Sequence, residues 1–255
     1  MIIVNAHRIN KGEMPLLNQK DKDFFFLEEN KKENLANYIS TLCKERLSTY
    51  YDLDPKKDMQ ILGPMRRGET GVQSLNIVLQ EALNPPSTYK KEHKFGNRIF
   101  RVGDKVMQIR NNYQKTWKLE SSGEEGEGVF NGDIGFIDFV DTREKKLHVL
   151  YEEDKRVIYE FSELEELEHC FATTIHKSQG SEFPVVVMPI TWAPPMLLNR
   201  NLLYTGITRA SKLVVLVGEK RYLEMMVKNQ RAQNRYSNLG EKLKRALELG
   251  ADFIG

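Results

Sequence analysis

The chain has 255 residues and a mass of 29.6 kDa, with 40% hydrophobic and 29% charged residues. A composition this hydrophobic excludes a disordered tail. A chain of this size buries about 70–75% of its unfolded surface and allows one large domain or two modest ones. No apolar run approaches the ~20 residues of a membrane span, and the opening MIIVNAHRIN lacks the pattern of a secretory signal. Cys43 and Cys170 cannot form a disulfide framework, so we expect a cytoplasmic protein.

The net charge of +2 is unevenly distributed along the chain. Residues 203–245 hold ten Lys and Arg against three Asp and Glu, whereas residues 142–169 hold five against nine. A basic C-terminal segment attracts polyanions, but a solvated helix face has the same composition. Charge alone leaves both interpretations open.

The first ninety residues alternate short apolar runs with helical patterns, which indicates a parallel sheet covered by helices. We expect strands at 24–27 and 59–62, and helices through 35–42 and 72–83. In each helix the apolar residues recur at helical spacing, which predicts one buried face. The prolines at 85–86 end the second helix.

Between about residues 98 and 161, alternating side chains and Gly-Asp pairs predict several short antiparallel strands. Their close spacing suggests a small β-barrel inserted into the α/β domain. Within it we expect a mobile loop at 120–128 and a turn formed by Asn131 and Asp133.

The α/β pattern resumes near Cys170. We expect strands at 185–188 and 213–217, rich in β-branched residues as in a sheet buried on both faces. The segment 199–210 between them has a helical pattern, and the chain beyond Glu219 is helical and basic, with a break at Gly240.

The loop GPMRRGET, Gly63–Thr70, follows a predicted strand and precedes a predicted helix, which is the setting of a phosphate-binding P-loop. Its glycines and Thr70 have P-loop spacing, but Glu69 occupies the lysine position. A carboxylate there repels a triphosphate, so we expect no P-loop binding of nucleotide. An ordinary strand-to-helix turn explains the glycines equally well. Since the sequence has no other Gly-rich lysine loop, a self-sufficient ATPase is not expected.

Two further segments place polar residues near strand ends, where open α/β sheets bind ligands. They are ATTIHKSQGSEF, residues 172–183, and NLLYTGITRASKLVVLVG, residues 201–218. In the second, Arg209 has the position from which a guanidinium can reach a phosphate. Taken singly, such a loop is usually ordinary surface, and such an arginine usually caps a helix.

Together, these two segments resemble motifs V and VI of superfamily 1 helicases, above all those of the RecD-like group that includes the exodeoxyribonuclease V alpha subunit. The ordered pair TIHKSQGSE, 174–182, and YTGITRA, 204–210, is highly specific. IIVNAHRINKGEMP and ILGPMRRGETGVQSLN also resemble that family. FRVGDKVMQIRN and FNGDIGF resemble its SH3-like 2B insertion.

The resemblance implies half of a motor in which two RecA-like lobes grip ATP. It implies that residues 1–95 and 162–255 form the second lobe, 2A, an α/β fold with a parallel sheet between helices, and that residues 96–161 form the inserted SH3-like barrel. ATP and Mg²⁺ would be held mainly by an N-terminal lobe whose motifs this sequence lacks. We therefore expect a C-terminal fragment, partnered by that lobe and by single-stranded DNA. The sequence leaves open whether the parent protein acts alone or binds other subunits of a nuclease–helicase complex.

The resemblance also implies roles by position. Arg209 matches the arginine finger that stabilises charge on the γ-phosphate. The nucleotide-facing residues would be Gln179, Gly180 and Glu182. The DNA-facing residues would be Thr174, His176, Lys177, Arg66 and Arg67.

The leading hypothesis is therefore the C-terminal motor half of an ATP-dependent helicase that moves 5′ to 3′ on DNA. A free-standing nucleic-acid-binding module without motor activity is the alternative, and an SH3 domain for proline-rich peptides is a weaker one.

Some residues remain open to two interpretations. Lys105 and Arg110 are lesser candidates for DNA contact. Tyr113, Trp117 and Phe130 either stack on bases or form the barrel core. The histidines lack partner ligands at standard spacing, so no metal site is expected.

Overall fold

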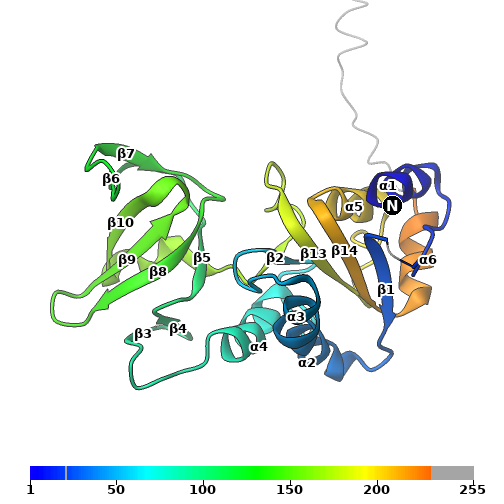
Figure 1. Cartoon of the computed structure of the whole chain (residues 1–255), viewed down its shortest axis with the longest axis horizontal. Coiled ribbons are helices and arrows are strands. Elements are labelled where there is room, and N and C mark those ends of the chain that lie inside the picture. The colour runs from blue at the N-terminus through cyan, green and yellow to red at the C-terminus, as the bar shows by residue number, and fades with distance from the viewer. Residues whose placement is uncertain (21, 231–255) are drawn as a thin grey trace, which may run out of the picture.

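The computed structural model describes residues 1–20 and 22–230. The predicted helical segment beyond residue 230, with its break at Gly240, lies outside the described residues. Five parallel strands form one sheet in the order β1-β14-β13-β2-β12, on the right of Figure 1. They are β1 (Phe24–Glu28), β2 (Met59–Gly63), β12 (Ala172–Thr174), β13 (Phe183–Ile190) and β14 (Ala210–Gly218). Each strand that the sequence predicted in this part of the chain is confirmed.

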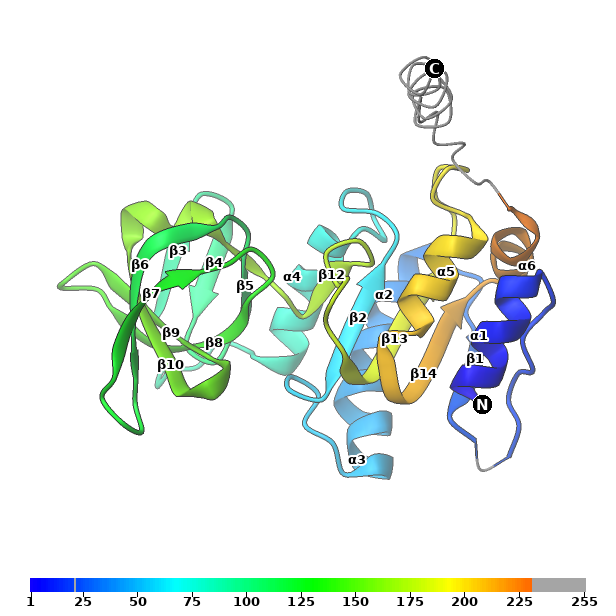
Figure 2. The same cartoon turned by 90° about the horizontal axis from the view of Figure 1, so that it is seen from above.

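Helices cover both faces of the parallel sheet (Figure 2). On one face lie α1 (Ile2–Lys11), α5 (Arg200–Ile207) and α6 (Lys220–Lys228). On the other lie α2 (Lys32–Thr41), the π-helical segment η1 (Leu42–Leu47) with its short continuation α3 (Ser48–Tyr51), and α4 (Val72–Leu83). The predicted helices are confirmed, and so is the predicted α/β class.

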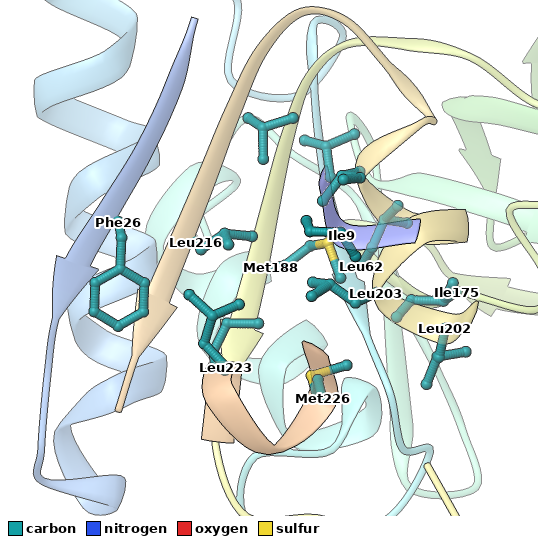
Figure 3. Packing of buried hydrophobic residues seen from close by; sticks show 14 of the residues in the cluster. Ile9, Phe26, Leu62, Ile175, Met188, Leu202, Leu203, Leu216, Leu223 and Met226 are labelled. Atoms are coloured by element: carbon teal, nitrogen blue, oxygen red, sulfur yellow. The ribbon is translucent and has the colours of Figure 1, made fainter. Parts of the chain in front are cut away.

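The alternation of side chains along β13 shows why its sequence is apolar throughout. Val186 and Met188 belong to the core beneath α1 and α5, whereas Val185 and Val187 belong to the core beneath α2 and α4. Successive side chains of a strand point to opposite faces, so a strand covered on both sides needs an unbroken apolar run. Figure 3 shows Met188 in the first core, in one cluster with Leu203 of α5.

A seven-stranded antiparallel sheet occupies the left of Figure 1, in the order β11-β5-β8-β9-β10-β6-β7. Its strands are β5 (Lys105–Gln108), β6 (Asn112–Leu119), β7 (Glu125–Val129), β8 (Ile134–Asp141), β9 (Lys146–Tyr151), β10 (Lys155–Glu160) and β11 (Leu167–His169). The 3₁₀ turns η2 (Glu152–Asp154) and η3 (Phe161–Glu166) flank β10, and a hairpin of β3 (Glu92–Phe95) and β4 (Arg98–Arg101) precedes the sheet. Apolar side chains of these elements form a third core.

The expectation of a mobile loop over residues 120–128 is wrong. Residues Glu125–Gly128 belong to β7, which pairs antiparallel with β6, so that Trp117 lies opposite Gly126. Only the turn between the two strands is loop. The glutamates and glycines of ESSGEEGEG have little intrinsic preference for strand, so the pairing with β6 decides the structure.

The division of the chain at 95/96 and 161/162 stays a prediction. In the structure β3 begins at Glu92, and β11, at Leu167–His169, pairs with β5 of the antiparallel sheet. Among the described residues, no helix has both the length and the apolar character needed to cross a membrane.

Candidate nucleic-acid and nucleotide sites

The carboxyl ends of β2 and β12 lie side by side, because these two strands pair in parallel with Thr174 opposite Gly63. The loops that follow them, residues 64–71 and 175–182, therefore start at the same edge of the sheet. These loops carry four of the five residues predicted to face DNA, and the fifth, Thr174, is the last residue of β12, so the structure gathers all five at one edge. We call it the carboxyl edge.

Two of these cations share one carboxylate. Arg66 Nη2 donates to Oε1 of Glu168, and Lys177 Nζ lies 3.2 Å from Oε2 of the same side chain. Arg67 and His176 are exposed and form no ion pair with any residue that the structure describes. The carboxyl edge therefore combines bound and unbound cationic groups around Thr174.

The loop with P-loop spacing is folded onto the helix that follows it. The backbone amides of Val72 and Gln73, at the start of α4, donate to the carbonyls of Met65 (3.0 Å) and Arg66 (3.1 Å). In a P-loop such amides bind phosphate. Here the loop itself occupies them, which gives a reason besides charge against phosphate binding at this helix end.

The side chains of the same loop agree with this geometry. Glu69, at the lysine position, forms a 3.0 Å ion pair with Lys32 of α2. The buried Thr70 hydroxyl, which would meet magnesium in a P-loop, has no hydrogen-bond partner among the described residues. The residues present do not fit a nucleotide triphosphate with its metal.

The chain returns to the opposite edge of the sheet between β12 and β13 (Figure 2). β13 and β14 begin there, with Phe183 opposite Ala210, and the amide of Phe183 donates to the carbonyl of Arg209 at 2.8 Å. We call this the amino edge. Along β2 the two edges are about 13 Å apart, at ~3.3 Å per residue.

Arg209 is fixed at the amino edge by carbonyl oxygens. Its Nε donates to Thr205 and its Nη1 to Ser181, both at 3.3 Å. The Ser181 contact ties Arg209 to the loop that contains Gln179, Gly180 and Glu182. The structure therefore places Gly180 and Glu182, on either side of Ser181, near Arg209. Gln179 lies instead in the turn that holds the predicted DNA-facing residues, and its amide donates to the carbonyl of His176 at 3.4 Å.

A cavity of about 760 Å³ separates this loop from the antiparallel sheet. Gly180 and Glu182 line one side, and Asp133 and Lys155 line the other. Gly180 has a φ of +93°, a conformation that favours glycine and lets the chain turn toward β13.

The prediction that Lys105 contacts DNA is wrong. The side chain is buried, and its Nζ donates to the carbonyl of Met59 at 3.2 Å. Burial lowers the pKa of Lys105 below its ordinary value, because the charged form loses its hydration. Arg110 is exposed and forms a 2.8 Å ion pair with Glu165, so its DNA contact stays a prediction.

The three aromatic candidates of the barrel divide between the two interpretations. Trp117 packs against the core, whereas Tyr113 and Phe130 are 68% and 43% exposed, and their rings meet edge to face with centroids 5.7 Å apart.

Asp133 accepts a 2.8 Å hydrogen bond from the amide of Phe130, and Gly132 has a φ of +107°. The predicted turn is confirmed.

Sequence reasoning missed Glu168 and Arg98. Arg98, in β4, donates to the carbonyl of Leu167 beside Glu168. Burial lowers the pKa of Arg98, while the charge of Glu168 opposes that shift. Neither residue belongs to a recognisable motif, and 69 positions separate Arg98 from Leu167, so the sequence carries no signal of their meeting.

Comparisons with known proteins match two parts of this chain to helicase family models, and neither match includes the loop 64–71. Residues 75–151 match the family model for the SH3 domain of ATP-dependent RecD-like DNA helicases. Residues 169–217 match the model for the UvrD-like helicase C-terminal domain. The second match contains the loop 175–182 and Arg209.

Similar curated proteins include an uncharacterised protein, MJ1519, from Methanocaldococcus jannaschii, 36% identical over 214 residues that cover 76% of this chain and 18% of the relative. The ATP-dependent RecD2 DNA helicase of Deinococcus radiodurans is 28% identical, over 90% of this chain and 28% of that protein. The RecBCD enzyme subunit RecD of Buchnera aphidicola is 25% identical, over 75% and 29%. The chain thus spans less than a third of each of these relatives.

Among solved structures, the Pif1 helicase from Bacteroides in complex with ADP-AlF3 and single-stranded DNA aligns with a TM-score of 0.49 and 16% identity, over 97% of this chain and 53% of that one.

The family matches confirm the resemblance to RecD-like helicases. This chain is related to the C-terminal part of RecD-like DNA helicases, and it joins a RecD-like SH3 segment to a UvrD-like helicase C-terminal segment.

Proposed function

We propose that this chain is the second motor lobe of an ATP-dependent DNA helicase that moves 5′ to 3′ on single strands. The observation that carries the proposal is the course of residues 175–182, which leave the carboxyl edge at Thr174 and reach Arg209 at the amino edge. One short segment thus joins a cationic surface to a fixed guanidinium.

The carboxyl edge suits a single strand of DNA. Phosphates are bound by guanidinium and ammonium groups and by hydroxyls, and Arg66, Arg67, Lys177, His176 and Thr174 supply such groups. Phosphate contacts of this kind are independent of base sequence, as translocation along a strand requires.

The amino edge suits one half of a nucleotide site. Arg209 offers a guanidinium that is bonded to Ser181, in the loop that also carries Gln179, Gly180 and Glu182, but the loop at Gly63–Thr70 does not fit a triphosphate. We infer that ATP and Mg²⁺ are held mainly by an N-terminal motor lobe in another part of the same protein. The magnesium ion would neutralise phosphate charge there, and Arg209 would approach the phosphates from this lobe.

Partners beyond DNA follow from the relatives. Four of them are named as subunits of the RecBCD enzyme, so association with further subunits of a nuclease–helicase complex is part of the proposal. Without the other lobe, this chain should hydrolyse no ATP.

The test is a titration of the chain with a fluorescent single-stranded oligonucleotide at several salt concentrations. The affinity should fall as salt rises, with a slope of about −0.7 in log K against log salt for each phosphate contact. Arg66→Ala and Lys177→Ala should each make the slope shallower by about 0.7. Arg221→Ala is the matched control, because this exposed arginine of α6 pairs only with Glu219 among the described residues. A slope near zero, or equal effects of all three substitutions, would refute the DNA-binding edge.

A further inference from the structure

A second hollow lies beside the carboxyl edge. It is a cleft of about 430 Å³ between α4, the β3–β4 hairpin and β12, and we call it the α4 cleft. Its size is at the small end of ligand pockets, which span about 300–1,000 Å³. The cleft is lined by three cationic side chains, Arg66, Lys177 and Arg98, together with Glu168.

The carboxylate of Glu168 occupies the position between the cations at which an external anion would bind. Its two carboxylate oxygens accept from Arg66 and Lys177, which come from two different loops. Arg98 contributes a third nearby positive charge. One carboxylate facing three cations leaves an excess of positive charge, and guanidinium groups bind phosphate oxygens in the same geometry as carboxylate oxygens. The Glu168 side chain is 25% exposed, so it can turn toward solvent when an anion replaces it.

The lining of the cleft suits a flat heterocycle. Ile77 of α4 and Ile99 of β4 are 66% and 37% exposed, which is unusual for isoleucines that line a hollow. Gln73 and Asn97 lie in the same lining, and their side-chain amides bond to nothing in the described part of the chain. Apolar walls that carry unused donors and acceptors are typical of sites that bind a base by packing and by its edge. Glu81, the other acidic residue of the cleft, pairs with Arg101.

We propose that the α4 cleft is a nucleotide subsite for single-stranded DNA, in which one unstacked base packs on Ile77 and Ile99 while its phosphate displaces the Glu168 carboxylate from Arg66 and Lys177. The proposal rests on the function proposed above. It adds an internal competitor, Glu168, which weakens binding at this position and lets the strand leave it.

The phosphate part is tested with Glu168→Gln in the full chain, using a single-stranded oligonucleotide. This variant should bind about three to ten times more tightly than the unmodified chain, because the cations lose a competing anion. Glu125→Gln is the control, since it removes the same charge from an exposed side chain paired with Lys118, to which no DNA contact is assigned. Equal tightening by both variants would show a general charge effect and overturn the proposal. Weaker binding by Glu168→Gln would overturn it too, because Glu168 would then position the cations.

The base part is tested with Ile77→Ser and with an oligonucleotide whose bases are removed at the bound positions. Ile77→Ser should weaken binding of the intact oligonucleotide about threefold to tenfold and leave binding of the abasic one unchanged. Ile3→Ser, at an exposed position of α1, controls for the loss of a surface isoleucine. Equal losses on both oligonucleotides, or no loss on either, would exclude a base in the cleft. If Arg66→Ala weakens binding but Glu168→Gln and Ile77→Ser lack the effects predicted above, the subsite alone is overturned. If Arg66→Ala has no effect on binding, the DNA-binding edge itself is refuted.

Discussion

Arg209 and Arg66 differ in a way that their sequence motifs do not show. Arg66 forms an ion pair with Glu168, whereas Arg209 bonds only to carbonyl oxygens and has no ion pair among the described residues. Carbonyls orient a guanidinium without cancelling its charge. An oriented and uncompensated charge is what stabilisation of a developing phosphate charge requires.

The two cysteines give a prediction at the scale of single residues. Burial raises the pKa of the Cys170 thiol to about 11 and that of Cys43 to about 12. At pH 8 about 0.1% or less of either thiol is then thiolate, the reactive form. The folded chain should not react with a thiol-specific reagent at pH 8, whereas the chain in denaturant should react at both cysteines.

The same shifts fix the sign of a pH effect on stability. Above about pH 9 the unfolded thiols lose their protons while the folded ones keep theirs, so the free energy of unfolding should fall as pH rises from 9 to 11.

In the experiment with the thiol-specific reagent, rapid labelling of the folded chain at pH 8 would contradict the buried positions of both cysteines.

At the scale of elements, burial decides what the sequence reveals. The strand β13 is apolar throughout, and β14 is apolar from Leu213 onward, because helices cover both faces, and their sequences show it directly. Helix α1 was not predicted, although Ile2, Ala6 and Ile9 are its buried face at helical spacing. Strand β7 has no apolar pattern at all and exists through its pairing with β6, which a local sequence pattern does not encode.

Gly126 tests that explanation of β7. A Cβ at this position would lie 2.4 Å from Cζ2 of Trp117, so Gly126→Ala must displace the indole ring. We expect the free energy of unfolding to fall by about 1–3 kcal/mol, measured by urea unfolding. In a Trp192→Phe background, the emission of Trp117 should shift to the red as the ring becomes exposed.

Glu127→Ala, on the same strand, is the control, because Glu127 is exposed and its loss should change stability by less than about 0.5 kcal/mol. If Gly126→Ala were as stable as this control, the contact between Trp117 and Gly126 would not hold the hairpin.

At the scale of the whole molecule, the fold separates residues that lie within nine positions of the sequence and for which two different roles are proposed. Thr174 and Glu182 are close along the chain, yet they lie at opposite edges of the parallel sheet. The resemblance to helicase motifs predicted which residues to assign to each function. It did not predict Glu168, because the contact of Glu168 with Arg66 forms only when the chain returns from the antiparallel sheet.

This separation makes a motor plausible in physical terms. A ligand that draws Arg209 toward another lobe also moves the loop 175–182, since Ser181 is bonded to the guanidinium. The other end of that loop carries Thr174 and Lys177. A change at the amino edge therefore has a direct covalent route to the DNA-facing surface.

The most direct test is the ATP hydrolysis rate of Arg209→Ala in the longer protein with both motor lobes that the proposal requires, measured with saturating single-stranded DNA. If Arg209 has the proposed role, the rate should fall about a thousandfold or more, as when an arginine finger of a known NTPase is removed, while DNA affinity without nucleotide stays unchanged. Arg221→Ala should leave the rate unaltered. A rate for Arg209→Ala within about twofold of the unmodified protein would contradict the account.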